Sequence, residues 1–254
     1  MPWNRLSRAA RQRRGWDAGL SGENEFWTRW LQGRGLTESE DYRRRIDATT
    51  EILEHLKPLI EAPVGSRVDV LDVGAGPLTA VGAVWPGCEL RVTAVDPLAV
   101  QYNQSLDRLG IIPPVRTQFG EAEHLLDQFQ PESFDLVYSR NALDHSYDPM
   151  LGVSNMFALA RVGGVVRLEH SVNEGRNQRY RGLHQWNFDV QEGRFVIWNK
   201  AKHIYVDKVL PPQARITCEK HDPARSGMPH WLNVTIMKTC QVRSELPQQR
   251  PMRQ

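Results

Sequence analysis

The stretch "VDVLDVGAGPLT", from Val68 to Thr79, decides the fold class. Branched apolar residues lead into Asp72, and Gly74 and Gly76 follow two positions apart. This pattern predicts a buried strand that ends in a tight turn. Because glycine has no Cβ, the backbone of such a turn can pass close to a ligand. We therefore expect a ligand site at the carboxyl end of this strand.

The chain beyond this strand alternates between strand and helix patterns. Such alternation is typical of an α/β, doubly wound sheet whose parallel strands are joined by right-handed crossovers. Two later strands, separated by turn-forming residues, predict an antiparallel hairpin at the edge of a mostly parallel seven-stranded sheet. The expected strands are 67–74, 89–96, 114–120, 133–139, 163–172, 214–221 and 231–239, and the expected helices between them are 98–110, 121–129 and 148–159.

The segment before the first strand lacks strand-like alternation and predicts an N-terminal helical extension. Apolar side chains share one helical face within 23–32, and a second helix is expected over 39–60. The arginine-rich start, residues 1–17, is expected to be a frayed basic arm. We therefore divide the chain into an N-terminal part, residues 1–66, and a ligand-binding domain, residues 67–254.

Composition narrows the class of protein. The 254 residues are 40% hydrophobic and 24% charged, which suits one sizeable α/β core. No stretch reaches the roughly 18 apolar residues of a membrane-spanning helix. Cys88, Cys218 and Cys240 form no C-x-x-C pair, so we expect a reducing cytoplasm and neither a disulfide framework nor a zinc knuckle. A net charge of +2 argues against nucleic acid as the main partner.

A second acidic residue indicates which ligand the glycine turn accepts. Asp96 ends the second expected strand, where a carboxylate can accept hydrogen bonds from a ribose diol. The dinucleotide pattern G-x-G-x-x-G requires a third glycine, but Thr79 stands at that position. Pro77 also removes an amide donor from the turn. These residues favour a ligand that is a nucleoside without a diphosphate. An NAD-dependent dehydrogenase is the less favoured alternative.

Five stretches in order resemble the motifs of class I S-adenosylmethionine-dependent methyltransferases of the type 11-like branch. They are "VLDVGAG", "VTAVDP", "FGEAEHL", "FDLVYSRNALDHSYDP" and "GGVVRLEH". The resemblance implies a Rossmann-like fold, S-adenosyl-L-methionine as cofactor and S-adenosyl-L-homocysteine as product. It places Asp72 at the methionine end, Asp96 at the ribose and Glu121 at the adenine. The full set of implied cofactor residues is Asp72, Gly74, Ala75, Gly76, Asp96, Pro97, Gly120, Glu121, Ala122, Arg140 and Asn141.

The loop after the fourth expected strand, "SRNALDHSYDP", carries the candidate catalytic residues. Methyl transfer to a hydroxyl requires removal of a proton, and His145 is the candidate base because imidazole titrates near neutral pH. Asp144 can orient His145 or bind the substrate. The alternative is that the pair only shapes the loop.

An insertion at about 175–203 follows the fifth expected strand and is rich in aromatic and polar side chains. Such a mixture suits a sugar, which offers apolar C–H faces and hydroxyls. The insertion and the early "WDAGLSGENEFWTRWL" resemble methyltransferases of bacterial polysaccharide and glycan pathways, which implies O-methylation of a sugar or glycan hydroxyl. Alternatively, the aromatic residues form the core of an irregular lobe. The candidate substrate residues are Tyr180, Arg181, His184, Trp186, Asn187 and His170.

Other functions and a metal site stay open. A small metabolite or quinone-like acceptor requires a mainly apolar pocket, and a non-catalytic S-adenosylmethionine-binding module requires no base. No ligand spacing of a known metal site occurs, so we expect no required metal. Magnesium (Mg2+) stays open as a cofactor because Asp144, His145, His170 and His184 can converge.

Overall fold

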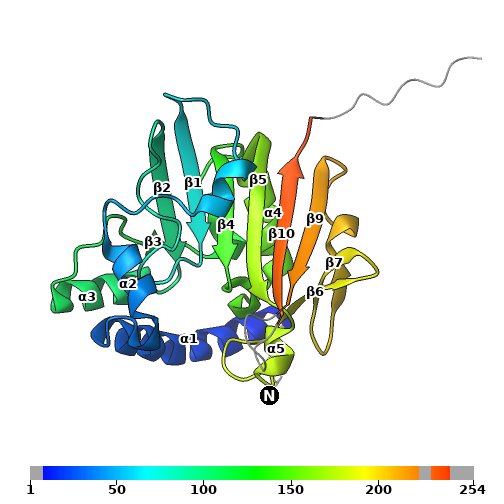
Figure 1. Ribbon diagram of the computed structural model, residues 1–254. Coiled ribbons are helices and arrows are strands. Elements are labelled where there is room, and N and C mark those ends of the chain that lie inside the picture. The colour runs from blue at the N-terminus through cyan, green and yellow to red at the C-terminus, as the bar shows by residue number, and fades with distance from the viewer. Residues whose placement is uncertain (1–7, 223–229, 241–254) are drawn as a thin grey trace, which may run out of the picture.

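The computed structural model describes residues 8–222 and 230–240 (Figure 1). Its main sheet has seven strands in the order β3-β2-β1-β4-β5-β10-β9. Strands β1 to β5 are parallel where they pair, and β10 runs antiparallel to β5 and β9. The expected fold class, with its antiparallel edge hairpin, is confirmed. The strands are β1 Arg67–Val73, β2 Glu89–Asp96, β3 Gln118–Phe119, β4 Phe134–Arg140, β5 Ala160–Ser171, β9 Ala214–His221 and β10 Trp231–Lys238.

Helices and short 3-10 turns connect the strands. Gly110, at φ 65°, ends α3 in the left-handed conformation, and Asp148 caps α4 by accepting a hydrogen bond from the Leu151 amide. No helix among the described residues has the length and hydropathy to cross a membrane. The α-helices are α1 Arg8–Gln32, α2 Ser39–Ile46, α3 Ala99–Leu109, α4 Pro149–Leu159 and α5 Glu174–Asn177, and the 3-10 helices are η1 Leu36–Glu38, η2 Glu54–Leu59, η3 Ala122–Asp127, η4 Leu143–His145 and η5 Val206–Lys208.

Both faces of the central strands are buried, which explains their nearly continuous apolar sequences. One face packs against α4 and η3. The other face carries Val70, Leu136 and Tyr138 and is covered by Ile52 and Leu56 from the segment before β1. Residues of the expected N-terminal part and of the expected domain therefore share one core.

Two expectations about the N-terminal part are wrong. Residues 8–17 of the expected frayed arm belong to α1, which crosses the carboxyl ends of the parallel strands (Figure 1). The helix expected over 39–60 stops at Ile46. Asp47 adopts an extended conformation and accepts hydrogen bonds from the amide and hydroxyl of Thr49. These local bonds replace the next helical turn.

The expected insertion contains a second, three-stranded antiparallel sheet rather than an irregular lobe. It consists of β6 Asn187–Gln191, β7 Arg194–Trp198 and β8 His203–Tyr205. Phe188 and Phe195 from this sheet are buried in the main core. The small sheet therefore packs against the main sheet, where β7 contacts the edge strand β9. The expected turn at 222–229 lies, apart from Asp222, outside the described residues.

Candidate active site

A cavity lies at the carboxyl ends of the parallel strands, where the sequence predicts it. The turns after β1, β2, β3 and β4 form one wall, and α1 forms the other. The residues that α1 contributes are Trp16, Leu20, Glu23 and Trp27. The strand ends and turns contribute, among others, Gly74, Gly76, Asp96, Pro97, Gly120, Glu121, Ala122, Arg140, Asn141 and His145.

The two glycines of the turn after β1 have the properties that the sequence predicts. Gly74 and Gly76 have φ angles of 73° and 66°, where residues with a Cβ are strained. A Cβ on Gly74 would lie 2.4 Å from the Cβ of Ala142, and one on Gly76 would lie 3.1 Å from the Trp27 ring. The intervening Ala75 is buried and does not line the cavity. The bare backbone of both glycines is therefore part of the cavity wall.

Asp96 lies across the cavity from α1 and is only 8% exposed. Its carboxylate accepts hydrogen bonds from the Leu98 amide at 2.9 Å and the Gly76 amide at 3.1 Å. These bonds tie the end of β2 to the glycine turn. Burial raises the pKa of Asp96 to about 7. A buried carboxylate with lone pairs remaining is suited to accept hydrogen bonds from a diol.

Asp72 lies beneath the glycine turn and does not line the cavity. The Thr79 hydroxyl donates a hydrogen bond to its carboxylate at 2.6 Å. Burial raises the pKa of Asp72 to about 6. Asp72 therefore supports the turn, and its contact with the methionine end of a cofactor stays a prediction.

Glu121 has a partner that the sequence does not predict. Arg13 on α1 donates two hydrogen bonds to its carboxylate, one of them at 2.6 Å. The Arg13 guanidinium also lies 4.6 Å from the ring centre of Trp16 and 4.9 Å from that of Tyr147. The bond to Glu121 raises the pKa of Arg13 above its usual value. Arg13 thus closes α1 over the region where the resemblance places the adenine.

Asn141 holds the loop after β4 in place through its side chain and its backbone. Asn141 has a φ of 49°, and its side-chain oxygen accepts a hydrogen bond from the Ser171 amide on β5 at 3.1 Å. The Asn141 amide donates to the Glu169 carbonyl at 2.7 Å. Asn141 therefore orders the loop as well as lining the cavity. Arg140 also lines the cavity and extends over the Trp231 ring.

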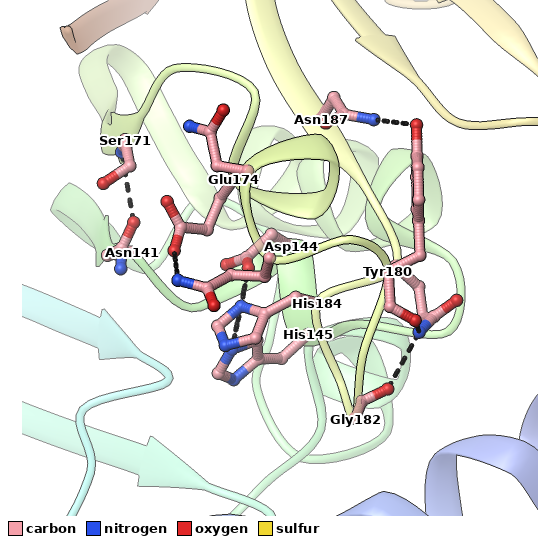
Figure 2. Close-up of polar contacts among 12 residues, drawn as sticks. Asn141, Asp144, His145, Ser171, Glu174, Tyr180, Gly182, His184 and Asn187 are labelled. Atoms are coloured by element: carbon pink, nitrogen blue, oxygen red, sulfur yellow. Dashed lines mark hydrogen bonds and ion pairs between the residues drawn. The ribbon is translucent and has the colours of Figure 1, made fainter. Parts of the chain in front are cut away.

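This loop brings Asp144 and His145 against His184 from the insertion (Figure 2). His184 Nδ1 lies 2.8 Å from Asp144 Oδ2 and 3.0 Å from His145 Nε2. Burial alone would raise the pKa of Asp144, but the two imidazoles lower it below its usual value. The hydrogen bond with Asp144 raises the pKa of His184 despite burial. We name Asp144, His145 and His184 the polar cluster.

Four other candidate substrate residues contact neighbouring parts of the protein and do not line the cavity. Asn187 accepts a hydrogen bond from the Arg176 amide and donates to the Tyr180 hydroxyl. His170 is buried, stacks on Phe188, and has a pKa lowered to about 4 by burial. Tyr180, Arg181, Asn187 and His170 do not line the cavity described above or the second cavity described next.

A second cavity adjoins the polar cluster. His145, Ser146 and Trp16 line both this cavity and the first one. Its other lining residues are Gly15, Tyr147, Gly182, Leu183, Gln185, Trp186 and Asn199. Trp186 is only 1% exposed, so it belongs to the core and to the cavity wall at once. Gln185 and Asn199 are cavity residues that the sequence analysis does not select.

The doubly wound sheet, the glycine turn and the buried acid after β2 define a class I methyltransferase domain. The sequence profile of a family described as "Methyltransferase domain" matches residues 71–168. The chain therefore contains an S-adenosylmethionine-dependent methyltransferase domain. Its cofactor is S-adenosyl-L-methionine, and the bare glycine turn and the Asp96 carboxylate fit a nucleoside of this kind.

The solved structures to which the chain is similar include three methyltransferases of low sequence identity. The CurJ carbon methyltransferase is 16% identical, with a TM-score of 0.49 over 71% of this chain and 50% of that chain. Phosphoethanolamine N-methyltransferase 2 of Haemonchus contortus is 17% identical, with a TM-score of 0.48 over 73% and 51%. A methyltransferase of Methanosarcina mazei is 13% identical, with a TM-score of 0.46 over 75% and 100%. The chain spans about half the length of the first two.

Proposed function

We propose that the protein transfers a methyl group from S-adenosyl-L-methionine to a hydroxyl of a sugar or glycan. The observation that carries this proposal is the position of His145, which lines both cavities. With the cofactor in the first cavity and the acceptor in the second, His145 lies between them. A group at this position can act on the acceptor atom that receives the methyl group.

The proton balance of the reaction gives the polar cluster a role. The acceptor oxygen forms a bond to the methyl carbon, the carbon–sulfur bond breaks, and its electron pair stays on sulfur. The hydroxyl proton must leave, and His145 is the proposed base. His184, itself held by Asp144, fixes the position of His145 through the contact between His184 Nδ1 and His145 Nε2. The buried Asp144 carboxylate also stabilises positive charge on His184, whose pKa it raises.

The lining of the second cavity supports a hydroxylated acceptor. Trp16 and Trp186 form part of its apolar wall. Gln185 Oε1 remains to accept hydrogen bonds and Asn199 Nδ2 to donate them, because Gln185 Nε2 and Asn199 Oδ1 already bond to the backbone. A quinone-like acceptor would favour a more uniformly apolar wall.

The three cysteines are free, which fits the expected cytoplasmic location.

Transfer of a labelled methyl group tests the proposal. The protein is incubated with methyl-labelled S-adenosyl-L-methionine and separate pools of sugar nucleotides, oligosaccharides and phenolic metabolites. We expect label in a carbohydrate pool, and His145→Ala should lower turnover far more than cofactor affinity. His203→Ala is the control, because His203 contacts Gln191 on the small sheet, away from both cavities. Label in the phenolic pool alone would support the metabolite alternative, and cofactor binding without transfer would support a binding module.

A further inference from the structure

We propose that the polar cluster binds a divalent first-row transition-metal ion, with Asp144, His145 and His184 as its ligands. Each residue offers one ligand atom, and the three atoms lie within 4.8 Å of one another. Two imidazole nitrogens and one carboxylate oxygen suit zinc, cobalt, iron or manganese better than magnesium, which prefers oxygen ligands.

The distances among the three atoms match those around a bound ion. The separations are 2.8 Å from His184 Nδ1 to Asp144 Oδ2, 3.0 Å from His184 Nδ1 to His145 Nε2, and 3.6 Å from His145 Nε2 to Asp144 Oδ2. A circle through these atoms has a radius of about 1.9 Å, slightly less than a metal bond of about 2.0–2.2 Å. A point about 1 Å out of their plane therefore lies at bonding distance from all three, with angles between roughly 85° and 120°.

Hydrogen bonds alone cannot pair all three of these atoms well, because too few hydrogens lie between them. His184 Nδ1 carries at most one hydrogen but is within hydrogen-bond distance of two acceptors. If His145 carries the hydrogen instead, the lone pair of His184 Nδ1 faces the Asp144 carboxylate at 2.8 Å. One cation satisfies all three atoms at once, because each then donates a lone pair.

Asp144 provides a second, independent observation. Its side chain is fully buried, and Oδ1 has no hydrogen-bond partner among the described residues. A buried ionised carboxylate is costly unless a cation or several donors compensate for its lost hydration. A divalent ion supplies that compensation directly.

The cluster meets the cavities through His145, which lines both, whereas Asp144 and His184 line neither. The side chains of His145 and His184 are 18% and 28% exposed, and His145 lines both cavities. Three protein ligands with open positions are typical of catalytic rather than structural metal sites. On the far side of the His145 ring, Glu23 Oε2 lies 3.8 Å from Nδ1, an ion-pair distance and not a hydrogen bond.

The use of the ion in catalysis rests on the proposed function, whereas its binding does not. An acceptor hydroxyl bound to the ion loses its proton to solvent more readily, because a bound cation lowers the pKa of a coordinated oxygen. With the ion bound, His145 Nε2 is a ligand, so this route replaces His145 as the base of the proposed function; without an ion, His145 takes the proton itself.

Direct metal binding tests the inference without any acceptor. Chelator-treated protein without a polyhistidine tag is titrated with Co²⁺ followed by its visible absorption, and with Zn²⁺ by calorimetry. We expect one ion per chain, tighter binding of zinc than of cobalt, and no displacement by excess Mg²⁺. Removal of a ligand should weaken binding by more than the roughly 10–100-fold loss that follows loss of an outer-shell partner.

The variants are His184→Ala and His145→Ala, so that failure of one to fold leaves the other. His124→Ala is the matched control: His124 Nδ1 lies 3.0 Å from Asp127 Oδ2, an exposed pair without a third ligand. No saturable binding by the wild type, or unchanged binding by folded variants of both histidines, would overturn the inference. Cofactor affinity and methyl transfer are then assayed on the same samples, so bound metal and bound cofactor without methyl transfer count against the proposed acceptor and not against the metal site.

Discussion

At the scale of single residues, Asp96 is the clearest test of the cofactor site. Asp96→Asn keeps the shape of the side chain and removes its charge. We expect cofactor affinity to fall about 10- to 100-fold, since hydrogen bonds to a charged group contribute about 1.5–3 kcal/mol. Calorimetry with S-adenosyl-L-homocysteine measures this change. Asp107→Asn, on the exposed face of α3, is the control. Equal affinity of Asp96→Asn and wild type would contradict the ribose contact.

The raised pKa of Asp96 adds a dependence on pH. Burial, helped by the neighbouring charges of Glu23 and Asp72, keeps part of the Asp96 carboxyl protonated near pH 7 in the free protein. Ribose hydroxyls donate to the ionised form, so cofactor binding should release a proton. Wild-type affinity should therefore rise with pH up to about 7, and the affinity of Asp96→Asn should not follow this rise.

Trp186 separates a core role from an acceptor role. Its side chain is almost fully buried yet lines the second cavity. We expect Trp186→Ala to lower the free energy of unfolding by about 3–5 kcal/mol. Trp186→Phe keeps most of the buried volume, so it should stay folded and raise the KM for the acceptor. Denaturant titration and steady-state kinetics measure the two effects. A wild-type KM in Trp186→Phe would assign Trp186 to the core alone.

The sequence predicts the cofactor side of the site better than the acceptor side. Gly74 and Gly76 are recognisable because they follow a strongly apolar strand, and Asp96 because it ends the next one. His184 approaches Asp144 across 40 positions of chain, and no periodic pattern reports such a contact. Arg13 was hidden for a different reason: a basic run has the same composition on a free arm as on a helix that covers a site.

At the scale of elements, α1 is the part of the molecule that closes the cofactor cavity. Arg13→Ala removes its bond to Glu121, whose carboxylate is buried. Because Glu121 then stays buried without its ion-pair partner, we also expect a lower melting temperature. Cofactor dissociation should become about two- to fivefold faster, the equivalent of up to about 1 kcal/mol. Stopped-flow release measures this rate, and Arg14→Ala, an exposed neighbour on the same helix, is the control. Equal release rates in both variants would remove Arg13 as a closing contact.

Elements were predicted well where tertiary burial and local preference agree. The strands β1, β2, β4 and β5 follow apolar runs that the sheet buries on both faces. The break after Ile46 was missed because apolar residues continue at helical spacing to residue 60. Those residues instead pack on the sheet from an extended segment and η2, which covers a face of β1 and β4. The spacing of apolar residues predicts which side chains are buried, but it does not determine whether the backbone there is helical or extended.

At the scale of the whole molecule, three buried acids with raised pKa values lie at one edge of the sheet. The pKa values of Asp72, Asp96 and Glu123 are raised by burial to about 6, 7 and 7. All three lie at or beside the turns that form the cofactor cavity. The ionisation of these carboxyl groups is therefore unfavourable in the folded state. A cofactor that donates hydrogen bonds to one of them offsets part of the free-energy cost of its ionisation.

This arrangement predicts how stability depends on pH. Each of these carboxyls binds its proton more tightly when folded than when unfolded, where its pKa is about 4. Their contribution to stability is therefore fully present below about pH 4 and is lost as the pH rises through 6 to 7. His170 opposes this trend over about pH 4 to 6.5, because its folded pKa is lowered to about 4, but three acids outweigh one imidazole.

We therefore expect the protein without cofactor to melt at a higher temperature near pH 5.5 than near pH 8. Asp96→Asn should reduce this difference, because the amide has no proton to lose. Saturating S-adenosyl-L-homocysteine should reduce it as well, since ribose hydroxyls stabilise the ionised carboxylate. Calorimetric melting in buffers of equal ionic strength measures all three curves. A melting temperature that rises steadily from pH 5.5 to 8 in the wild type would show that these carboxyls are already ionised in the folded protein.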